Sequence, residues 1–153
     1  MKDFRVLLVD DETEFVNTLA ERLRMRELES EVAYDGEQAL QFFKEGEVPD
    51  VMILDLKMPG IDGMEVLRRV RKAYPRVQVI ILTGHGTDKD EAEAKRLGAF
   101  SYLKKPVDLN TLVQTMKSAF KKLEDSMAAA AFAEEGDFAG ARQYLEKSKK
   151  EDK

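Results

Sequence analysis

The chain has 153 residues, of which 43% are hydrophobic and 36% charged, and its formal net charge is −5. This composition is that of a soluble globular protein, and the negative charge argues against direct binding to nucleic acid or to a membrane surface. The absence of cysteine excludes disulfides and thiolate metal sites, and the N-terminal apolar run is too short for a signal peptide or a membrane span, so we expect a cytoplasmic protein.

Short apolar runs alternate with helical patterns along the chain. Strands are expected over residues 4–9, 31–34, 50–56, 77–83 and 100–103. Helices are expected over residues 13–27, 36–45, 63–73, 88–97 and 108–124, with Thr13 as the N-cap of the first. The longest apolar runs are almost continuous Val, Ile and Leu, which is typical of strands buried on both faces of a parallel sheet. The pattern predicts an α/β fold with a doubly wound five-stranded parallel sheet in the flavodoxin-like order 2-1-3-4-5.

The C-terminal part of the chain is richer in Ala, Glu and Lys. Apolar spacing predicts helices over about 126–135 and 138–149, with a break at "EGDF". We therefore expect two units, a domain over residues 1–124 and a helical hairpin extension over 125–153 that resembles one tetratricopeptide-like helix pair. A lone pair cannot bury its apolar face unaided, so Phe132, Phe138 and Tyr144 are expected to pack on the domain, on a second copy or on a partner.

Polar residues stand where the predicted strands end. The first strand ends in Asp10 and Asp11, the third in Asp55 and the fourth in Thr83, whereas Lys104 and Lys105 begin the loop after the fifth. In an open parallel sheet, ligands bind beyond the carboxyl ends of the strands at the point where the strand order reverses, here between strands 1 and 3. The topology therefore predicts one site that gathers these side chains.

Three converging carboxylates would repel one another unless a cation lay between them. Oxygen ligands that leave room for water and phosphate favour Mg²⁺, and a nearby lysine and threonine suit a phosphoryl group. Neither a Walker A loop nor a kinase glycine loop is present, which argues against nucleotide hydrolysis. Asp55, which precedes the turn "KMPGIDG", is the candidate nucleophile for an aspartyl phosphate. Each residue alone also has a plain structural explanation, as a strand end or a turn residue.

Four motifs in order carry a specific resemblance. They are "LLVDDE", "VMILDLKMPGIDGMEVL", "VIILTGHG" and "GAFSYLKKPVD". On these motifs, residues 3–123 resemble the receiver domain of bacterial two-component response regulators.

The resemblance implies a magnesium-dependent transfer of a phosphoryl group from the phosphohistidine of a sensor histidine kinase to Asp55. It further implies that Thr83 and Lys105 contact the phosphoryl group and that Tyr102 changes rotamer with the switch. Lys105 is preferred to Lys104 because the family's lysine precedes a proline across a cis bond. The implied metal ligands are Asp10, Asp11, Asp55 and the backbone carbonyl of Lys57.

The leading hypothesis is a stand-alone response regulator that signals through a downstream protein or through self-association, without an enzymatic or DNA-binding output domain. In the family, the residues two beyond the acceptor and two beyond the switch threonine, here Lys57 and His85, influence the phosphoryl lifetime. A phosphatase-type enzyme with an aspartyl nucleophile is an alternative, disfavoured because Lys57 stands where its general acid would be. A second alternative is an adaptor that uses the hairpin regardless of phosphorylation.

Overall fold

The computed structural model describes residues 4–134 and contains each strand and helix predicted within that range. The strand bounds fall within two residues of those expected. The strands are β1 (Val6–Val9), β2 (Ser30–Ala33), β3 (Val51–Leu54), β4 (Gln78–Thr83) and β5 (Ser101–Lys104). The helices are α1 (Thr13–Arg24), α2 (Gly36–Lys44), α3 (Gly63–Ala73), α4 (Asp88–Arg96) and α5 (Leu109–Glu134). None of the helices within residues 4–134 combines the length and hydrophobicity needed to cross a membrane.

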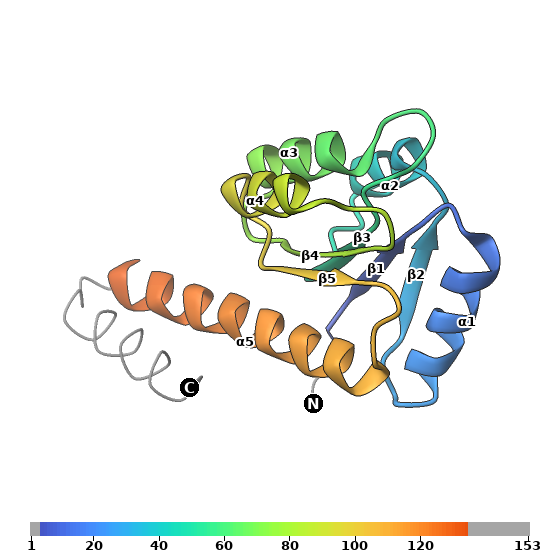
Figure 1. The fold of residues 1–153 in the computed structure, drawn as a ribbon. Helices are drawn as coiled ribbons and strands as arrows, with labels where there is room; N and C mark the ends of the chain where they lie inside the picture. The colour runs from blue at the N-terminus through green and yellow to red at the C-terminus, as the bar shows by residue number, and fades with distance from the viewer. Residues whose placement is uncertain (1–3, 135–153) are drawn as a thin grey trace.

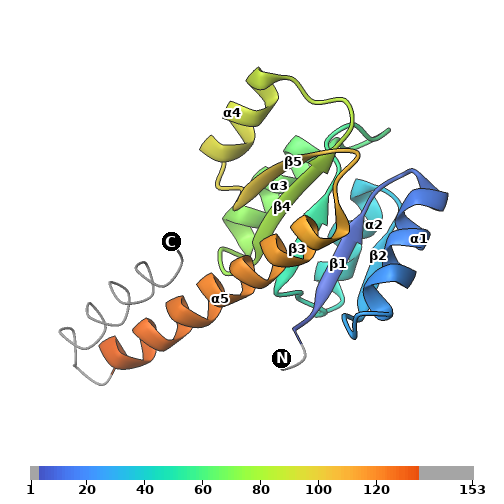
Figure 2. The same ribbon diagram turned by 60° about the horizontal axis from the view of Figure 1, so that its bottom comes forward.

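The strands form one parallel sheet in the order β2-β1-β3-β4-β5, which confirms the predicted fold class. Helices α1 and α5 cover one face, and α2, α3 and α4 cover the other (Figures 1 and 2). Successive strand residues point to opposite faces, so Leu8 and Ile53 pack toward α1 and α5, whereas Leu7 and Leu54 pack toward α2 and α3. Both faces are thus apolar, which explains the almost unbroken runs of Val, Ile and Leu.

The register brings the strand ends level with one another. Val9 is paired with Leu54, and the ladder continues one residue further because the N–H of Asp55 donates to the carbonyl of Val9 at 3.0 Å. On the far side of the sheet, the N–H of Lys105 donates to the carbonyl of Thr83 at 2.9 Å. The polar residues that follow the strands therefore start from fixed backbone positions at one edge of the sheet.

The prediction that Thr13 caps α1 is wrong. Thr13 is the first helical residue, and Glu12 occupies the N-cap position without a capping hydrogen bond from its side chain. The turn that leads into the helix is instead formed one step earlier, where the carboxylate of Asp10 accepts the N–H of Glu12 at 2.9 Å. The helix begins at residue 13, as the expected range has it, and only the capping role given to Thr13 is wrong.

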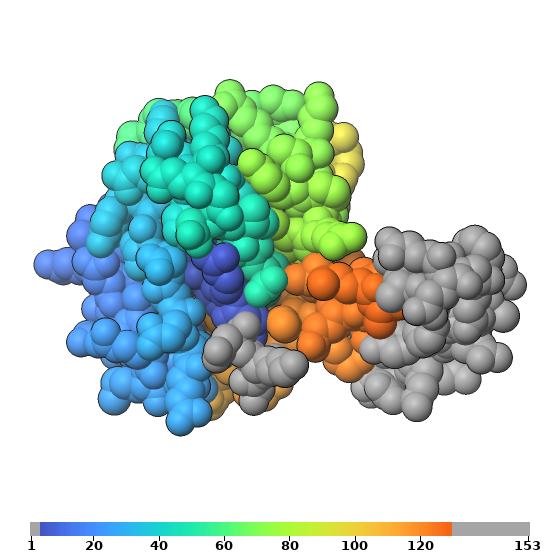
Figure 3. All heavy atoms as spheres, turned by 180° about the vertical axis from the view of Figure 1, so that it is seen from behind, coloured from blue at the N-terminus to red at the C-terminus, as the bar shows by residue number. Residues whose placement is uncertain are grey.

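The boundary expected near residue 124 is not a break in the helix. α5 runs without interruption from Leu109 to Glu134, so the first helix predicted for the hairpin is a continuation of α5. This stretch contains neither glycine nor proline, and an ion pair between Lys121 and Asp125 at 3.2 Å spans the expected boundary. α5 projects beyond the sheet (Figure 1), and its atoms extend to one side of the molecule in Figure 3. The second predicted hairpin helix and the contacts expected for Phe132, Phe138 and Tyr144 lie outside what the structure describes.

Candidate functional site

Three aspartates converge at the carboxyl edge of the sheet, between β1 and β3. Oxygens of Asp10, Asp11 and Asp55 lie within 4.8 Å of one another. Asp10 and Asp55 are 4% and 3% exposed, whereas Asp11 is exposed. Two charges are thus held out of water by the ends of buried strands, and the third faces the solvent from which a cation would arrive.

Lys105 reaches this cluster from the loop after β5. Its Nζ atom lies 2.6 Å from Asp10 Oδ2, 3.1 Å from Glu12 Oε1 and 3.9 Å from Asp55 Oδ2. The Lys105–Pro106 peptide bond is cis, and the ammonium lies 4.2 Å from the ring centroid of Phe15. An ammonium among these carboxylates partly offsets their mutual repulsion.

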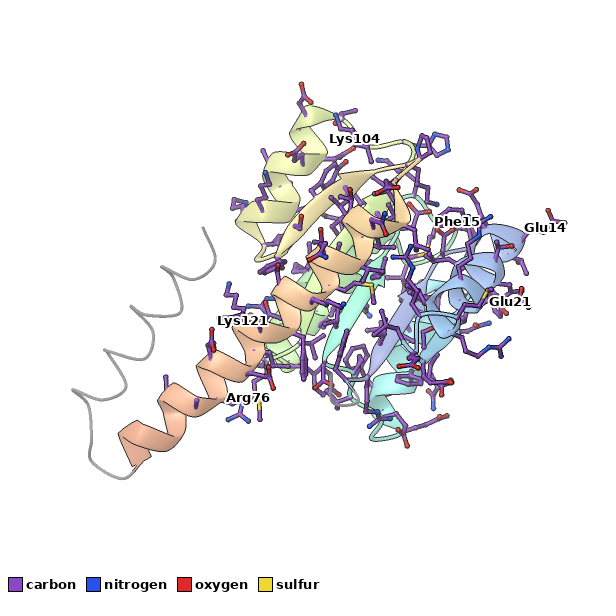
Figure 4. The ribbon with its side chains drawn as sticks, turned by 90° about the horizontal axis from the view of Figure 1, so that it is seen from below. Glu14, Phe15, Glu21, Arg76, Lys104 and Lys121 are labelled. Atoms are coloured by element: carbon purple, nitrogen blue, oxygen red, sulfur yellow. The ribbon has the colours of Figure 1, made fainter. Side chains whose placement is uncertain are left out.

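Lys104 does not take part in the cluster. Its side chain is 61% exposed, and its closest recorded acidic partner is Asp88 at 3.9 Å. In Figure 4, Phe15, whose ring lies under the Lys105 ammonium, is on α1, whereas Lys104 lies near α4. The two adjacent lysines therefore have different environments, as expected for neighbours that leave a strand on opposite faces.

The charges of the site depend on one another. Burial raises the pKa of Asp10 above its ordinary value, although the hydrogen bonds from Lys105 and from the Glu12 N–H oppose this rise. Burial lowers the pKa of Lys105, but its hydrogen bond to Asp10 and the nearby carboxylates outweigh that effect, and the net direction is upward. Lys105 is therefore an ammonium at neutral pH, paired mainly with Asp10 rather than with Asp55.

Asp55 retains an unused ligand atom. Its Oδ1 atom is buried and has no hydrogen-bond partner among residues 4–134, and its nearest recorded cation lies 3.9 Å from its other oxygen. A buried carboxylate oxygen without a partner is costly unless something binds it. The set of oxygen donors, with an excess of negative charge, fits Mg²⁺.

Thr83 and Tyr102 lie next to the site on β4 and β5. Thr83 is 1% exposed, and its Oγ1 atom accepts the N–H of His85 at a long 3.5 Å. Tyr102 is 8% exposed, and its buried hydroxyl has no hydrogen-bond partner within the part of the chain that the structure describes. A Cβ at Gly86 would lie 1.6 Å from that hydroxyl, so only glycine leaves room for it. Burial and the acids Asp90, Glu91 and Asp88 raise the pKa of Tyr102.

Sequence reasoning missed two polar contacts of the loop after Asp55. Lys57 Nζ lies 3.4 Å from Asp90 Oδ2 at the start of α4. Asp90 also forms a capping box with Thr87, a pairing that the spacing "TDKD" could have indicated. The carboxylate of Glu37, on α2, accepts the N–H of Ile61, and no local pattern in the sequence points to this contact.

Comparison with known proteins defines the class. The profile of the response regulator receiver domain matches residues 6–117, so the chain belongs to this family. Among curated relatives, the transcriptional regulatory protein TrcR of Mycobacterium tuberculosis is 37% identical over 119 residues, which are 77% of this chain and 46% of TrcR. The regulatory protein AtoC of Escherichia coli is 32% identical over 135 residues, which are 82% of this chain and 29% of AtoC. The chain thus spans less than half the length of these relatives.

Solved structures agree with this assignment. A CheY-like receiver domain protein from Methanospirillum hungatei has a TM-score of 0.77 and 26% identity, over 82% of this chain and 99% of that one. A receiver domain protein from Clostridium thermocellum has a TM-score of 0.74 and 34% identity, over 79% and 97% of the two chains. The chain is therefore similar to isolated receiver domains over nearly their whole length.

Proposed function

We propose that this protein is a phosphorylation-controlled signalling switch in which Asp55 accepts a phosphoryl group from the phosphohistidine of a sensor histidine kinase. The observation that carries the proposal is the buried Asp55 carboxylate, which has an unpartnered oxygen and lies beside two further acids and a lysine. In the transfer, an Asp55 oxygen bonds to phosphorus, the phosphorus–nitrogen bond of the donor breaks, and the imidazole leaves.

The acids would hold Mg²⁺ through Asp10, Asp11, Asp55 and the backbone carbonyl of Lys57. The ion supplies positive charge that offsets the repulsion between the carboxylates and the incoming phosphoryl oxygens. Lys105 donates to a phosphoryl oxygen, which requires its ammonium to move from Asp10 and Glu12 toward Asp55.

Thr83 donates its hydroxyl to another phosphoryl oxygen. Because the hydrogen bond that Thr83 Oγ1 now accepts from the His85 N–H is long, little is lost when this hydroxyl turns toward Asp55. Tyr102 responds through the β4–α4 loop that contacts its ring. The phosphoryl group thereby favours one arrangement of this loop, which a downstream protein or a second copy recognises.

Two further parts of the proposal concern the chain as a whole. Residues 1–124 are the receiver domain, and residues 125–153 extend it as an interaction segment, with α5 continuous across the boundary. The protein acts in the cytoplasm, where histidine kinases present their phosphohistidine, and it does not bind nucleic acid directly. A phosphatase activity is disfavoured because Lys57, at the position of the general acid, carries an ammonium that pairs with Asp90.

Acetyl phosphate with Mg²⁺ tests the acceptor. Intact-mass measurement is expected to show one added phosphoryl group on the wild-type protein and none on Asp55→Asn. Asp62→Asn, which removes the N-cap acid of α3 in the same loop, serves as the control and is expected to be labelled. Equal labelling of Asp55→Asn would refute the assignment, and a phosphotransfer profile against purified histidine kinases tests the donor.

A further inference from the structure

A carboxylate outside the acid cluster holds the loop that follows Asp55. Glu37 lies in the first turn of α2, and its Oε1 atom accepts the N–H of Ile61 at 3.1 Å. The two residues are 24 positions apart in the sequence. A hydrogen bond to a charged acceptor is stronger than a neutral one, and the N-terminus of a helix favours a negative side chain.

Two glycines allow the loop to approach α2 this closely. Gly60 has a φ of +75°, and a Cβ there would lie 2.7 Å from Glu37 Oε1. A Cβ at Gly36 would lie 2.6 Å from the carbonyl oxygen of Ile61. The tip of the loop therefore rests directly on the first turn of α2.

The base of the loop is closed by backbone groups. The N–H of Gly63 donates to the carbonyl of Leu56 at 2.9 Å, and a Cβ at Gly63 would lie 2.0 Å from the carbonyl oxygen of Asp55. Lys57 lies between this base and the tip that Glu37 holds. Its carbonyl is the backbone ligand in the proposed Mg²⁺ site, so the path of the loop decides where that oxygen lies.

We propose that Glu37 is a positioning residue for the metal site, an inference that rests on the proposed function. Glu37 is not among the residues proposed to hold the metal or the phosphoryl group. It fixes the tip of the loop through Ile61 and Gly60, and the loop in turn fixes the carbonyl of Lys57 beside Asp55. Outer contacts of this kind orient ligands, and their removal typically weakens metal binding about 10–100-fold.

The test compares Mg²⁺ binding and amide exchange in the full chain. Glu37→Ala is expected to raise the Mg²⁺ dissociation constant, measured calorimetrically, about tenfold. It is also expected to speed hydrogen exchange of the Ile61 N–H in the metal-free protein. Phosphorylation by acetyl phosphate slows at low Mg²⁺ and recovers at saturating Mg²⁺, because the acceptor itself is intact.

Two variants separate positioning from general stability. Glu37→Gln keeps an oxygen that accepts the Ile61 N–H, so near wild-type Mg²⁺ affinity is expected. Glu45→Ala removes an exposed acid at the other end of α2 that does not hold this loop, so its Mg²⁺ affinity is also expected to match the wild type.

Each outcome decides between the two proposals. A lower melting temperature of Glu37→Ala with an unchanged Mg²⁺ constant overturns the positioning role and leaves the proposed function standing. Weak binding by Glu37→Gln, equal to that of Glu37→Ala, also contradicts the role of the hydrogen bond. A wild-type protein that binds no Mg²⁺ overturns the proposed function, and this inference with it.

Discussion

Replacing Lys105 with methionine tests how the site tolerates its buried acids without metal. The substitution removes an ammonium that lies 2.6 Å from Asp10 and 3.9 Å from Asp55, both of which are almost fully buried. The methionine keeps most of the apolar stem, so the main loss is electrostatic. We expect the metal-free variant to be less stable than the wild type at pH 7.

The size of the loss has an upper limit set by protonation. A buried carboxylate that loses its partner can take up a proton instead of remaining charged. A pH of 7 is about three units above the ordinary aspartate pKa of 3.8, and this difference sets the free energy of protonation. This costs about 4 kcal/mol, in the range of about 3–5 kcal/mol typical of broken buried ion pairs. At pH 5 the same limit falls to about 1.5 kcal/mol. The loss grows with pH because the unpaired aspartate has a higher pKa in the folded state than in the unfolded state. Such a group destabilises the folded protein above its unfolded-state pKa and not below it.

Urea unfolding in EDTA at pH 7 and pH 5 measures this difference. Lys104→Met is the matched control, because that lysine is 61% exposed and lies 3.9 Å from Asp88, and a change within about 0.5 kcal/mol is expected. In an Asp10→Asn background, Lys105→Met is expected to cost less, since its closest partner no longer carries charge. A loss below about 1 kcal/mol at pH 7, or an equal loss at both pH values, would refute this reasoning.

Three further predictions concern the surroundings of the site. Lys57→Met is expected to speed amide exchange in the first turn of α4, because this helix buries only one residue and loses its ion pair with the loop after Asp55. Lys95→Met removes an ion pair within α4 and is expected to leave exchange in that loop unchanged. Equal effects of the two substitutions on the loop would argue against the Lys57–Asp90 contact. Gly86→Ala is expected to expel Tyr102 from its buried position and to increase tyrosine accessibility to nitration, and unchanged accessibility would contradict the packing. The carboxyl group of Glu65 is expected to have a pKa of about 2 by NMR at low salt, because two arginines bind it, and this pKa should move toward 4.5 at high salt. The stabilisation from these ion pairs is present above pH 4.5 and is lost as the pH falls toward 2. A low-salt pKa near 4.5 would contradict this prediction.

The sheet and the place of the site follow from simple patterns in the sequence. Apolar runs such as the one that ends at Leu54 are predicted within two residues, because strands buried on both faces leave little choice of period. Once the order of strands is given, the residues after β1, β3 and β5 must meet at one edge. The cluster of Asp10, Asp55 and Lys105 is therefore a consequence of topology rather than of local sequence.

Side-chain contacts between residues far apart in the sequence could not be predicted from such patterns. Glu37 accepts the Ile61 N–H only once α2 has packed beside the loop after Asp55. Lys57 pairs with Asp90 only because that loop lies next to the start of α4. The N-cap of α1 was misjudged, although its first residue was not, because the side chain that accepts a backbone N–H before the helix is that of Asp10, which binds the Glu12 N–H. The end of α5 was misjudged because a change in composition was taken as a boundary, although no glycine or proline interrupts the helix.

The central claim is that Asp55 itself forms the phosphoryl bond. Borohydride reduction of the protein after treatment with acetyl phosphate and Mg²⁺ converts an aspartyl phosphate into homoserine, which peptide mass spectrometry locates in the chain. Homoserine is expected at position 55 and absent when Mg²⁺ is withheld. Homoserine at Asp10 or Asp11, or none at any position although the protein binds Mg²⁺, would contradict the claim.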